Sequence, residues 1–175
     1  MHNRYIMTAF GVDRVGFVTD VTRLLYENDC NLEDTTMGML VDEFTLSLLF
    51  SSSDPDIEEK LARECRRLEL EKGISAFVRQ LPRRERNNTA GTRMVNLHIE
   101  GLDQAGIVYK TSQFLTENNL NIVQLDSTAS PSPQSGATLY SMNLQVELPL
   151  ELNAGRFEED LSHVADELQV DITLS

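Results

Sequence analysis

The sequence contains an internal repeat with a spacing of 90 residues. Gly11-Val-Asp-Arg-Val-Gly-Phe-Val18 returns as Gly101-Leu-Asp-Gln-Ala-Gly-Ile-Val108, and Asn28-Asp-Cys-Asn-Leu32 returns as Asn118-Asn-Leu-Asn-Ile122. A repeat of this length indicates two copies of one structural unit. Because both copies keep the motif G-x-D-x-x-G and the asparagine beyond it, we expect two equivalent small-ligand sites rather than one catalytic centre.

Each copy is predicted to contain the same six elements in the order βαββαβ, because alternating and helical apolar patterns follow one another in that order. The predicted strands cover 4–10, 31–40, 43–51 and 75–79 in the first copy, and 94–100, 121–129, 139–147 and 170–174 in the second. The first predicted helix of each copy begins at Gly16 or at Gly106. The second predicted helix covers 55–71 in the first copy and 155–168 in the second. This order predicts an α+β, ferredoxin-like fold with an antiparallel sheet and both helices on one face.

The domain prediction is two units, at 1–81 and 93–175, joined by a polar linker at 82–92. Units this small often gain stability by packing on another unit or on a second chain. In the first unit Ile6, Phe10 and Leu49 are expected on the sheet face that carries no helix, which favours pairing. We therefore expect a homodimer.

Charge excludes several classes of partner. The 175 residues carry a net charge of −13, with −4 in residues 1–86 and −9 in residues 87–175. An acidic surface repels phosphate backbones and anionic lipids, so neither direct nucleic-acid binding nor membrane binding is expected. The first residues lack a secretion-signal pattern and no long apolar run occurs, so a cytoplasmic protein is expected.

The G-x-D-x-x-G motif carries the strongest chemical signal. It lies between a predicted strand and a predicted helix, whose N-terminus presents free N–H groups suited to a carboxylate. Asp13 and Asp103 could accept hydrogen bonds from an ammonium group, and an amino acid carries both groups. The alternative is that Asp13 caps the helix while the glycines only turn the chain.

Asn31 and Asn121 open the second strand of each copy, beside the glycine turn or facing a neighbouring unit. An asparagine there could hold a ligand carboxylate or amine, or could be an ordinary turn residue. His2, His98 and His163 share no ligand-type spacing, so no metal is expected. No catalytic triad, phosphate loop or cofactor fingerprint can be assembled, so neither an enzyme nor a bound cofactor is expected.

Several segments are typical of one family: Gly11 to Val18, Cys30-Asn-Leu32, Glu43-Phe44, and Ser135-Gly-Ala-Thr-Leu-Tyr-Ser-Met142 followed by Pro149. On these segments both copies resemble ACT domains, the amino-acid-sensing modules of biosynthetic enzymes and regulators. From about residue 4 to 174, the two-unit chain resembles the glycine cleavage system transcriptional repressor family.

The resemblance implies a regulatory, non-catalytic protein whose ACT domains pair side by side into an eight-stranded sheet, with amino acids bound at the seam. By matching motif positions, it implies ligand contacts from Asp13, Val15, Gly16, Phe17 and Asn31, and from Asp103, Ala105, Gly106, Ile107 and Asn121. The family usually has proline immediately before the second glycine, where this chain has Val15 and Ala105. The first helical turn is therefore expected to be less preordered.

These observations favour a regulatory protein that binds glycine or a similar small amino acid. By resemblance, it would modulate transcription or metabolism through a protein partner, and a DNA-binding regulator is the partner that the resemblance implies. The alternative is an ACT module that assembles with proteins and binds no ligand.

Overall fold

A computed structural model describes residues 3–82, 91–133 and 135–175. The chain divides into two compact units, within 1–86 and 87–175. Of the expected linker over 82–92, residues 83–90 lie outside the described residues, and Thr92 belongs to the first strand of the second unit. Within the described ranges, no helix is long and apolar enough to cross a membrane.

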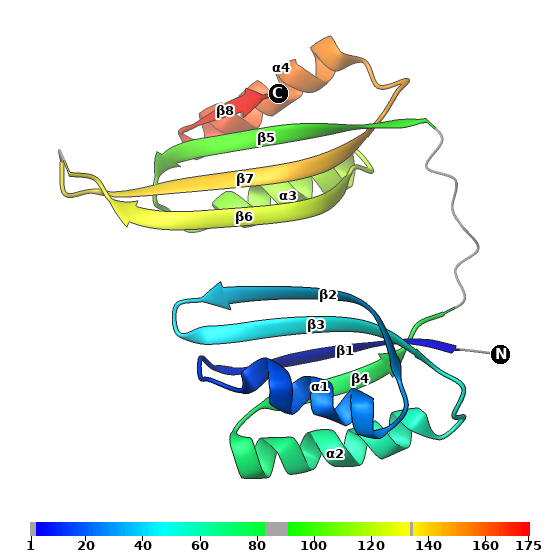
Figure 1. The fold of residues 1–175 in the computed structure, drawn as a ribbon. Helices are drawn as coiled ribbons and strands as arrows, with labels where there is room; N and C mark the ends of the chain where they lie inside the picture. Colours follow the sequence, from blue (N-terminus) through cyan, green and yellow to red (C-terminus); the bar gives the residue numbers. More distant parts are fainter. Residues whose placement is uncertain (1–2, 83–90, 134) are drawn as a thin grey trace. The chain divides into compact units, whose positions relative to one another are not determined.

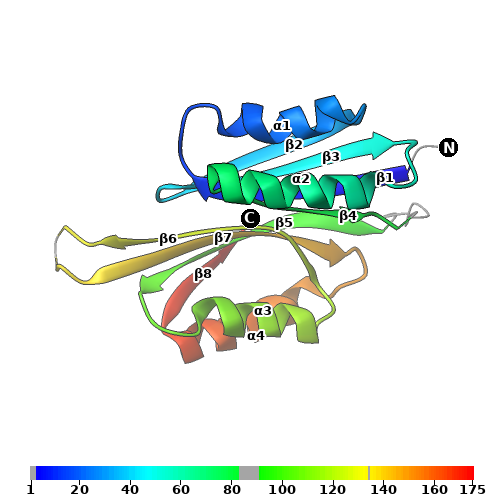
Figure 2. The same ribbon diagram turned by 90° about the horizontal axis from the view of Figure 1, so that it is seen from below.

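Unit 1 has the predicted βαββαβ order (Figure 1). Its elements are β1 (Asn3–Val12), α1 (Phe17–Glu27), β2 (Asn31–Leu40), β3 (Glu43–Ser52), α2 (Ile57–Lys72) and β4 (Ser75–Gln80). The strands form an antiparallel sheet in the order β2-β3-β1-β4. Both helices lie on one face of this sheet (Figure 2), which confirms the predicted α+β fold.

Unit 2 repeats the arrangement, with the sheet order β6-β7-β5-β8. Its elements are β5 (Thr92–Leu102), α3 (Ile107–Glu117), β6 (Asn121–Pro131), β7 (Thr138–Pro149), α4 (Ala154–Leu168) and β8 (Val170–Leu174). The strands β6 and β7 run longer than the pattern predicts, because pairing continues to Pro131 and Thr138 through residues whose composition is typical of a loop.

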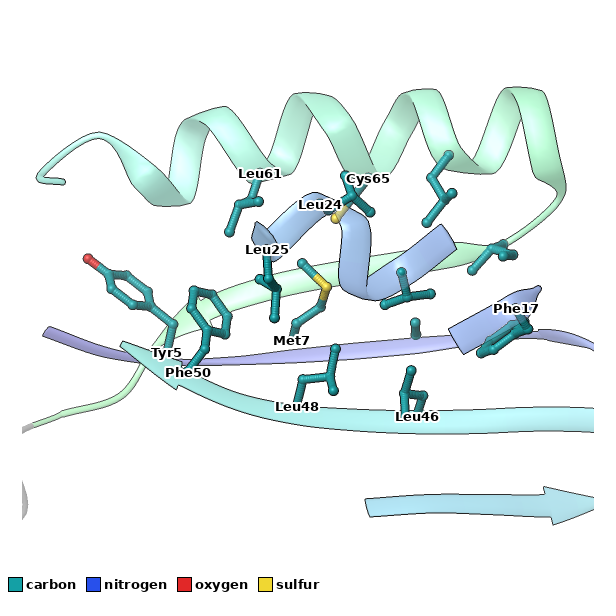
Figure 3. Close-up of a cluster of buried hydrophobic side chains, with 14 of the residues drawn as sticks. Tyr5, Met7, Phe17, Leu24, Leu25, Leu46, Leu48, Phe50, Leu61 and Cys65 are labelled. Carbon is teal, nitrogen blue, oxygen red and sulfur yellow. The ribbon is translucent and has the colours of Figure 1, made fainter. Parts of the chain in front are cut away.

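The core of unit 1 lies between the sheet and its helices (Figure 3). Tyr5, Met7 and Ala9 alternate along β1 and are buried, as the sequence predicts. The rings of Tyr5 and Phe50 stack with their centroids 5.4 Å apart. On α1 the apolar residues Phe17, Val21, Leu24 and Leu25 are buried, whereas Val18 has an exposed fraction of 40%. Val18 therefore lies at the edge of the helix face rather than in the core.

The first glycine of each motif does not form the turn, contrary to the sequence prediction. Gly11 and Gly101 lie inside β1 and β5, which continue one residue further. A β-carbon on Gly11 would lie 3.1 Å from the Gly73 carbonyl oxygen, and one on Gly101 would lie 2.8 Å from Cγ1 of Val170. These glycines are therefore required for close packing against the end of the second helix and the strand that follows it.

Both cysteines are free and contribute to packing. Cys65 lies on the buried face of α2, and burial raises the pKa of its thiol to about 11. Burial also raises the pKa of the half-buried Cys30 thiol. Since the thiolate is the reactive form, neither cysteine is primed for chemistry near neutral pH.

Candidate ligand-binding turns

The second glycine of each motif makes the turn that starts the helix. Gly16 has φ 91° and Gly106 has φ 101°, a left-handed conformation that side chains rarely adopt. The helices α1 and α3 then begin at Phe17 and Ile107. The neighbouring Val15 is fully exposed, so the turn projects its side chain into solvent.

Asp13 and Asp103 hold the turns through their backbones and not through their carboxylates. The Asp13 N–H donates to the Asp42 carbonyl over 2.8 Å, and the Asp103 N–H donates to the Thr138 carbonyl over 2.9 Å. Neither helix start has a side-chain cap. Both aspartates are exposed, and their carboxylates accept no hydrogen bond from any described residue. The alternative interpretation, that Asp13 caps the helix, is therefore wrong.

Free donors follow each turn. The first backbone hydrogen bond of α1 runs from the Asp20 N–H to the Gly16 carbonyl over 2.8 Å. The N–H groups of Val18 and Thr19, the two residues before Asp20, have no acceptor in the part of the chain that the structure describes. In unit 2 the matching donors are those of Val108 and Tyr109. Such N–H groups, at the positive end of the helix dipole, can bind an anion.

The side chains of Phe17 and Ile107 are not available to a ligand. Both are buried, with exposed fractions of 1% and 2%. The Phe17 ring packs against Phe44 at a centroid distance of 5.8 Å, and its N–H donates weakly to the Arg14 carbonyl over 3.3 Å. In both units, therefore, the candidate site consists of an exposed carboxylate and backbone groups.

An ion pair that the sequence analysis missed fixes the turn of unit 1. The Arg14 guanidinium donates to the Asp20 carboxylate over 2.6 Å, from a residue before the turn to the first turn of α1. This hydrogen bond holds the pKa of Asp20 below its ordinary value of 3.8. The spacing alone could have suggested the pair, but unit 2 has Gln104 and Lys110 at the equivalent positions, so the repeat concealed it.

Unit 2 fixes its turn against α4 instead. The Gln104 side chain donates to the Leu168 carbonyl, and the Lys110 ammonium pairs with Glu167. Both partners belong to the last turn of α4. The two turns thus have the same backbone conformation but different supports.

The structure separates the asparagines from the turns within each unit. Asn31 pairs with Ser51, and Ser51 faces Arg4 near the start of β1, whereas Asp13 follows the end of that strand. The two levels lie at opposite ends of β1, which has ten residues, and a strand of that length spans about 30 Å. The expectation that this asparagine lies beside the turn of its own unit is therefore wrong, and the other option, that it faces a neighbouring unit, stays a prediction.

Asn31 and Asn121 lie on open sheet edges. Every residue of β2 is exposed, and Asn31 makes no side-chain hydrogen bond with any described residue. The Asn121 amide donates to the Glu147 carboxylate over 3.1 Å. In the described ranges, no group of three His, Cys, Asp or Glu side chains could hold a metal ion.

Comparisons of sequence agree with this architecture. The family model of the ACT domain matches residues 3–79. The glycine cleavage system transcriptional repressor of Escherichia coli (strain K12) is 25% identical over 166 residues, which cover 93% of this chain and 84% of the repressor. A UPF0237 protein of Methanopyrus kandleri is 32% identical over 76 residues, which cover 43% of this chain and 84% of its own.

Comparisons of structure extend the similarity to the whole chain. An unknown protein from Galdieria sulphuraria superposes with a TM-score of 0.78 at 29% identity, covering 100% of this chain and 98% of its own. A structure described provisionally as a glycine cleavage system transcriptional repressor has a TM-score of 0.71 at 20% identity, and the match covers 100% of this chain and 97% of the other. The latter similarity supports the fold alone.

The topology of both units, the family match and these relatives all agree. This chain is a tandem ACT-domain protein: its unit 1 belongs to the ACT-domain family, its unit 2 repeats the same topology, and nearly its full length is similar to the glycine cleavage system transcriptional repressor of Escherichia coli.

Proposed function

We propose that this protein is a non-catalytic regulator that binds glycine or a similar small amino acid at its glycine turns. One observation carries the proposal. Each unit presents an exposed, unpartnered carboxylate, Asp13 or Asp103, a few residues before N–H groups that have no acceptor among the described residues. This combination occurs in both units, although their turns are supported by different side chains.

The chemistry of the turn matches the two ends of an amino acid. The N–H groups of Val18 and Thr19 would bind the carboxylate, helped by the dipole of α1. The Asp13 carboxylate would accept from the ammonium group. A small ligand is favoured because one relative is named for the glycine cleavage system.

Pairing of sheet edges would complete each site. The exposed strand β2 can pair antiparallel with β2 of a second copy. A pairing centred on the middle of β2 would place Asn31 of one copy beside Leu40 of the other. The hydrogen bond from Asp13 to Asp42 ties the glycine turn to the β2–β3 hairpin that follows Leu40. Asn31 would therefore reach the turn of the neighbouring copy, a contact that it cannot make within its own unit.

Regulation would proceed through a protein partner. The net charge of −13 opposes direct binding to DNA, and the related Escherichia coli protein is named as a transcriptional repressor. We propose that a DNA-binding regulator is the partner. The ligand would change this interaction only if it binds one packing of the ACT units better than another.

Thermal unfolding in the presence of each common amino acid tests the proposal. A ligand that binds only the folded state raises the unfolding midpoint, so we expect one small amino acid to do so selectively. Replacing both Asp13→Ala and Asp103→Ala should weaken its binding about tenfold to a hundredfold, because each replacement removes a charged hydrogen bond. Asp171→Ala, which removes an exposed carboxylate on β8, is the matched control.

The outcomes distinguish a sensor from an assembly module. If no amino acid raises the midpoint of the folded protein, the chain is an assembly module and the proposal is wrong. If an amino acid binds but the double variant keeps full affinity and its fold, the carboxylates are not in the site.

A further inference from the structure

The sheet face of unit 1 that carries no helix is apolar at its centre. Ile6 and Phe10 of β1 and Leu49 of β3 lie on this face, because they alternate with buried core residues. Phe77 of β4 pairs with Thr8 and joins them. The exposed fractions are 45% for Phe10 and 53% for Phe77. A cluster of exposed apolar side chains on one face indicates an interaction surface.

The same face of unit 2 is polar. The positions equivalent to Ile6, Phe10, Leu49 and Phe77 hold Asn96, Glu100, Gln145 and Thr173. Nearby, Nδ1 of His98 lies 2.8 Å from Oδ1 of Asn143. The fold therefore does not require apolar side chains on this face, and the apolar surface is a separate property of unit 1.

Opposite charges flank the apolar centre of unit 1. Asp34 on the edge strand β2 pairs with Leu49, and Arg79 on the edge strand β4 pairs with Ile6. Since Ile6 also pairs with Leu49, one row across the sheet reads Asp34, Leu49, Ile6, Arg79. The row is apolar in the middle, acidic at one edge and basic at the other.

We propose that a second copy of this chain docks on this face, sheet against sheet. A two-fold axis parallel to the strands would place the β4 edge of one copy over the β2 edge of the other. Arg79 of each copy would then meet Asp34 of the second copy, while Ile6 and Leu49 pack at the centre. Aligned sheets stack in this way about 10 Å apart.

The size of the face predicts a weak dimer. The face of a four-stranded sheet of this kind measures roughly 19 by 30 Å. Stacking two copies would therefore bury a total surface area on the order of 1,100 Å². That area is at the lower limit for specific association, so the dimer should dissociate on dilution. The face lies apart from the free donors of the glycine turns, and stacking leaves the outer edge of β2 open to the edge pairing proposed above. This inference and the proposed ligand binding can therefore fail independently.

Sedimentation of the full chain over a series of dilutions tests the proposal. Beyond any pairing through the β2 edges, we expect a concentration-dependent self-association whose dissociation constant rises about tenfold or more when Phe10→Ser and Phe77→Ser are combined. Leu102→Ser is the control, because Leu102 is a similarly exposed apolar residue on the free face of unit 2. A monomer at every concentration, or a dimer that the double variant leaves unchanged, would overturn the proposal.

Charge reversal supplies a second test, in which a lost contact can be told apart from a lost fold because two folded variants should restore association when they are mixed. Arg79→Asp and Asp34→Arg should each weaken self-association, because each places like charges opposite one another. Mixing the two variants should restore the dimer. In the mixed dimer the introduced aspartate of one copy faces the introduced arginine of the other, and the unchanged Arg79 and Asp34 face each other at the opposite edge. If each variant associates as tightly alone as in the mixture, the docked geometry is wrong.

Discussion

Thr111 is a buried hydroxyl without a hydrogen bond. It lies fully buried in α3, and its Oγ1 has no partner among the described residues. The equivalent residue in unit 1 is Val21, which is also fully buried. Burying an unpaired hydroxyl costs free energy that a methyl group of the same shape avoids.

Thr111→Val should therefore raise the free energy of unfolding by about 1 kcal/mol. Urea unfolding of the wild-type and variant chains measures the change. Thr22→Val is the control, because the Thr22 hydroxyl is exposed and already bonds to the Val18 carbonyl over 2.8 Å; it should change stability by about 0.5 kcal/mol or less. A loss of stability in Thr111→Val would mean that its hydroxyl has a partner.

Sequence could identify some site residues but not their surroundings. Gly16 and Gly106 follow from the repeat, since a glycine kept between a strand and a helix indicates a turn that other residues avoid. The free carboxylate of Asp13 does not follow, because an aspartate near a helix start fits capping equally well. Only the backbone geometry, with Gly16 as the N-cap, separates the two.

The element α1 depends on the pair formed by Arg14 and Asp20. Because this pair lowers the pKa of Asp20 in the folded chain, its stabilisation is present above the ordinary pKa of 3.8 and is lost as the pH falls through the folded-state pKa. Asp20→Asn should reduce the free energy of unfolding by about 1 kcal/mol near neutral pH. The difference from wild type should close at acidic pH.

Urea unfolding at a series of pH values measures this difference. The control is Glu59→Gln, which removes the exposed pair with Arg63 and should cost little at any pH. A difference between Asp20→Asn and wild type that persists below the folded-state pKa would show that the variant acts through packing rather than through charge.

Elements were easier to predict than the places where they meet. Alternation in β1 and β3 and the helical stripe of α1 predicted the sheet and its covered face, because burial dictates both patterns. One of the two positions predicted for Asn31, beside the turn of its own unit, is wrong for a topological reason. The helix α1 carries the chain back along the sheet, so a residue just after it returns to the far end of β1. Gly11 was misplaced because a strand that ends at a glycine and one that passes through it look alike in sequence.

At the scale of the whole molecule, the repeat predicts two units of one fold, and both have it. The repeat does not predict where the two units differ in their side chains. Unit 1 has an apolar free face and Arg14 at its turn, whereas unit 2 has a polar face and Gln104. These differences lie at positions that the shared fold leaves unconstrained, so the hydrophobic pattern of the sequence does not predict them.

The central claim is that the two glycine turns bind a small amino acid. Nuclear magnetic resonance of the isotope-labelled chain, titrated first with glycine and then with the other small amino acids, tests it most directly. The account predicts that one of them moves the amide signals of Val18 and Thr19, or of Val108 and Tyr109, because these N–H groups would bind the carboxylate. Signals that stay fixed at both turns with every amino acid, or that move only elsewhere, would contradict it.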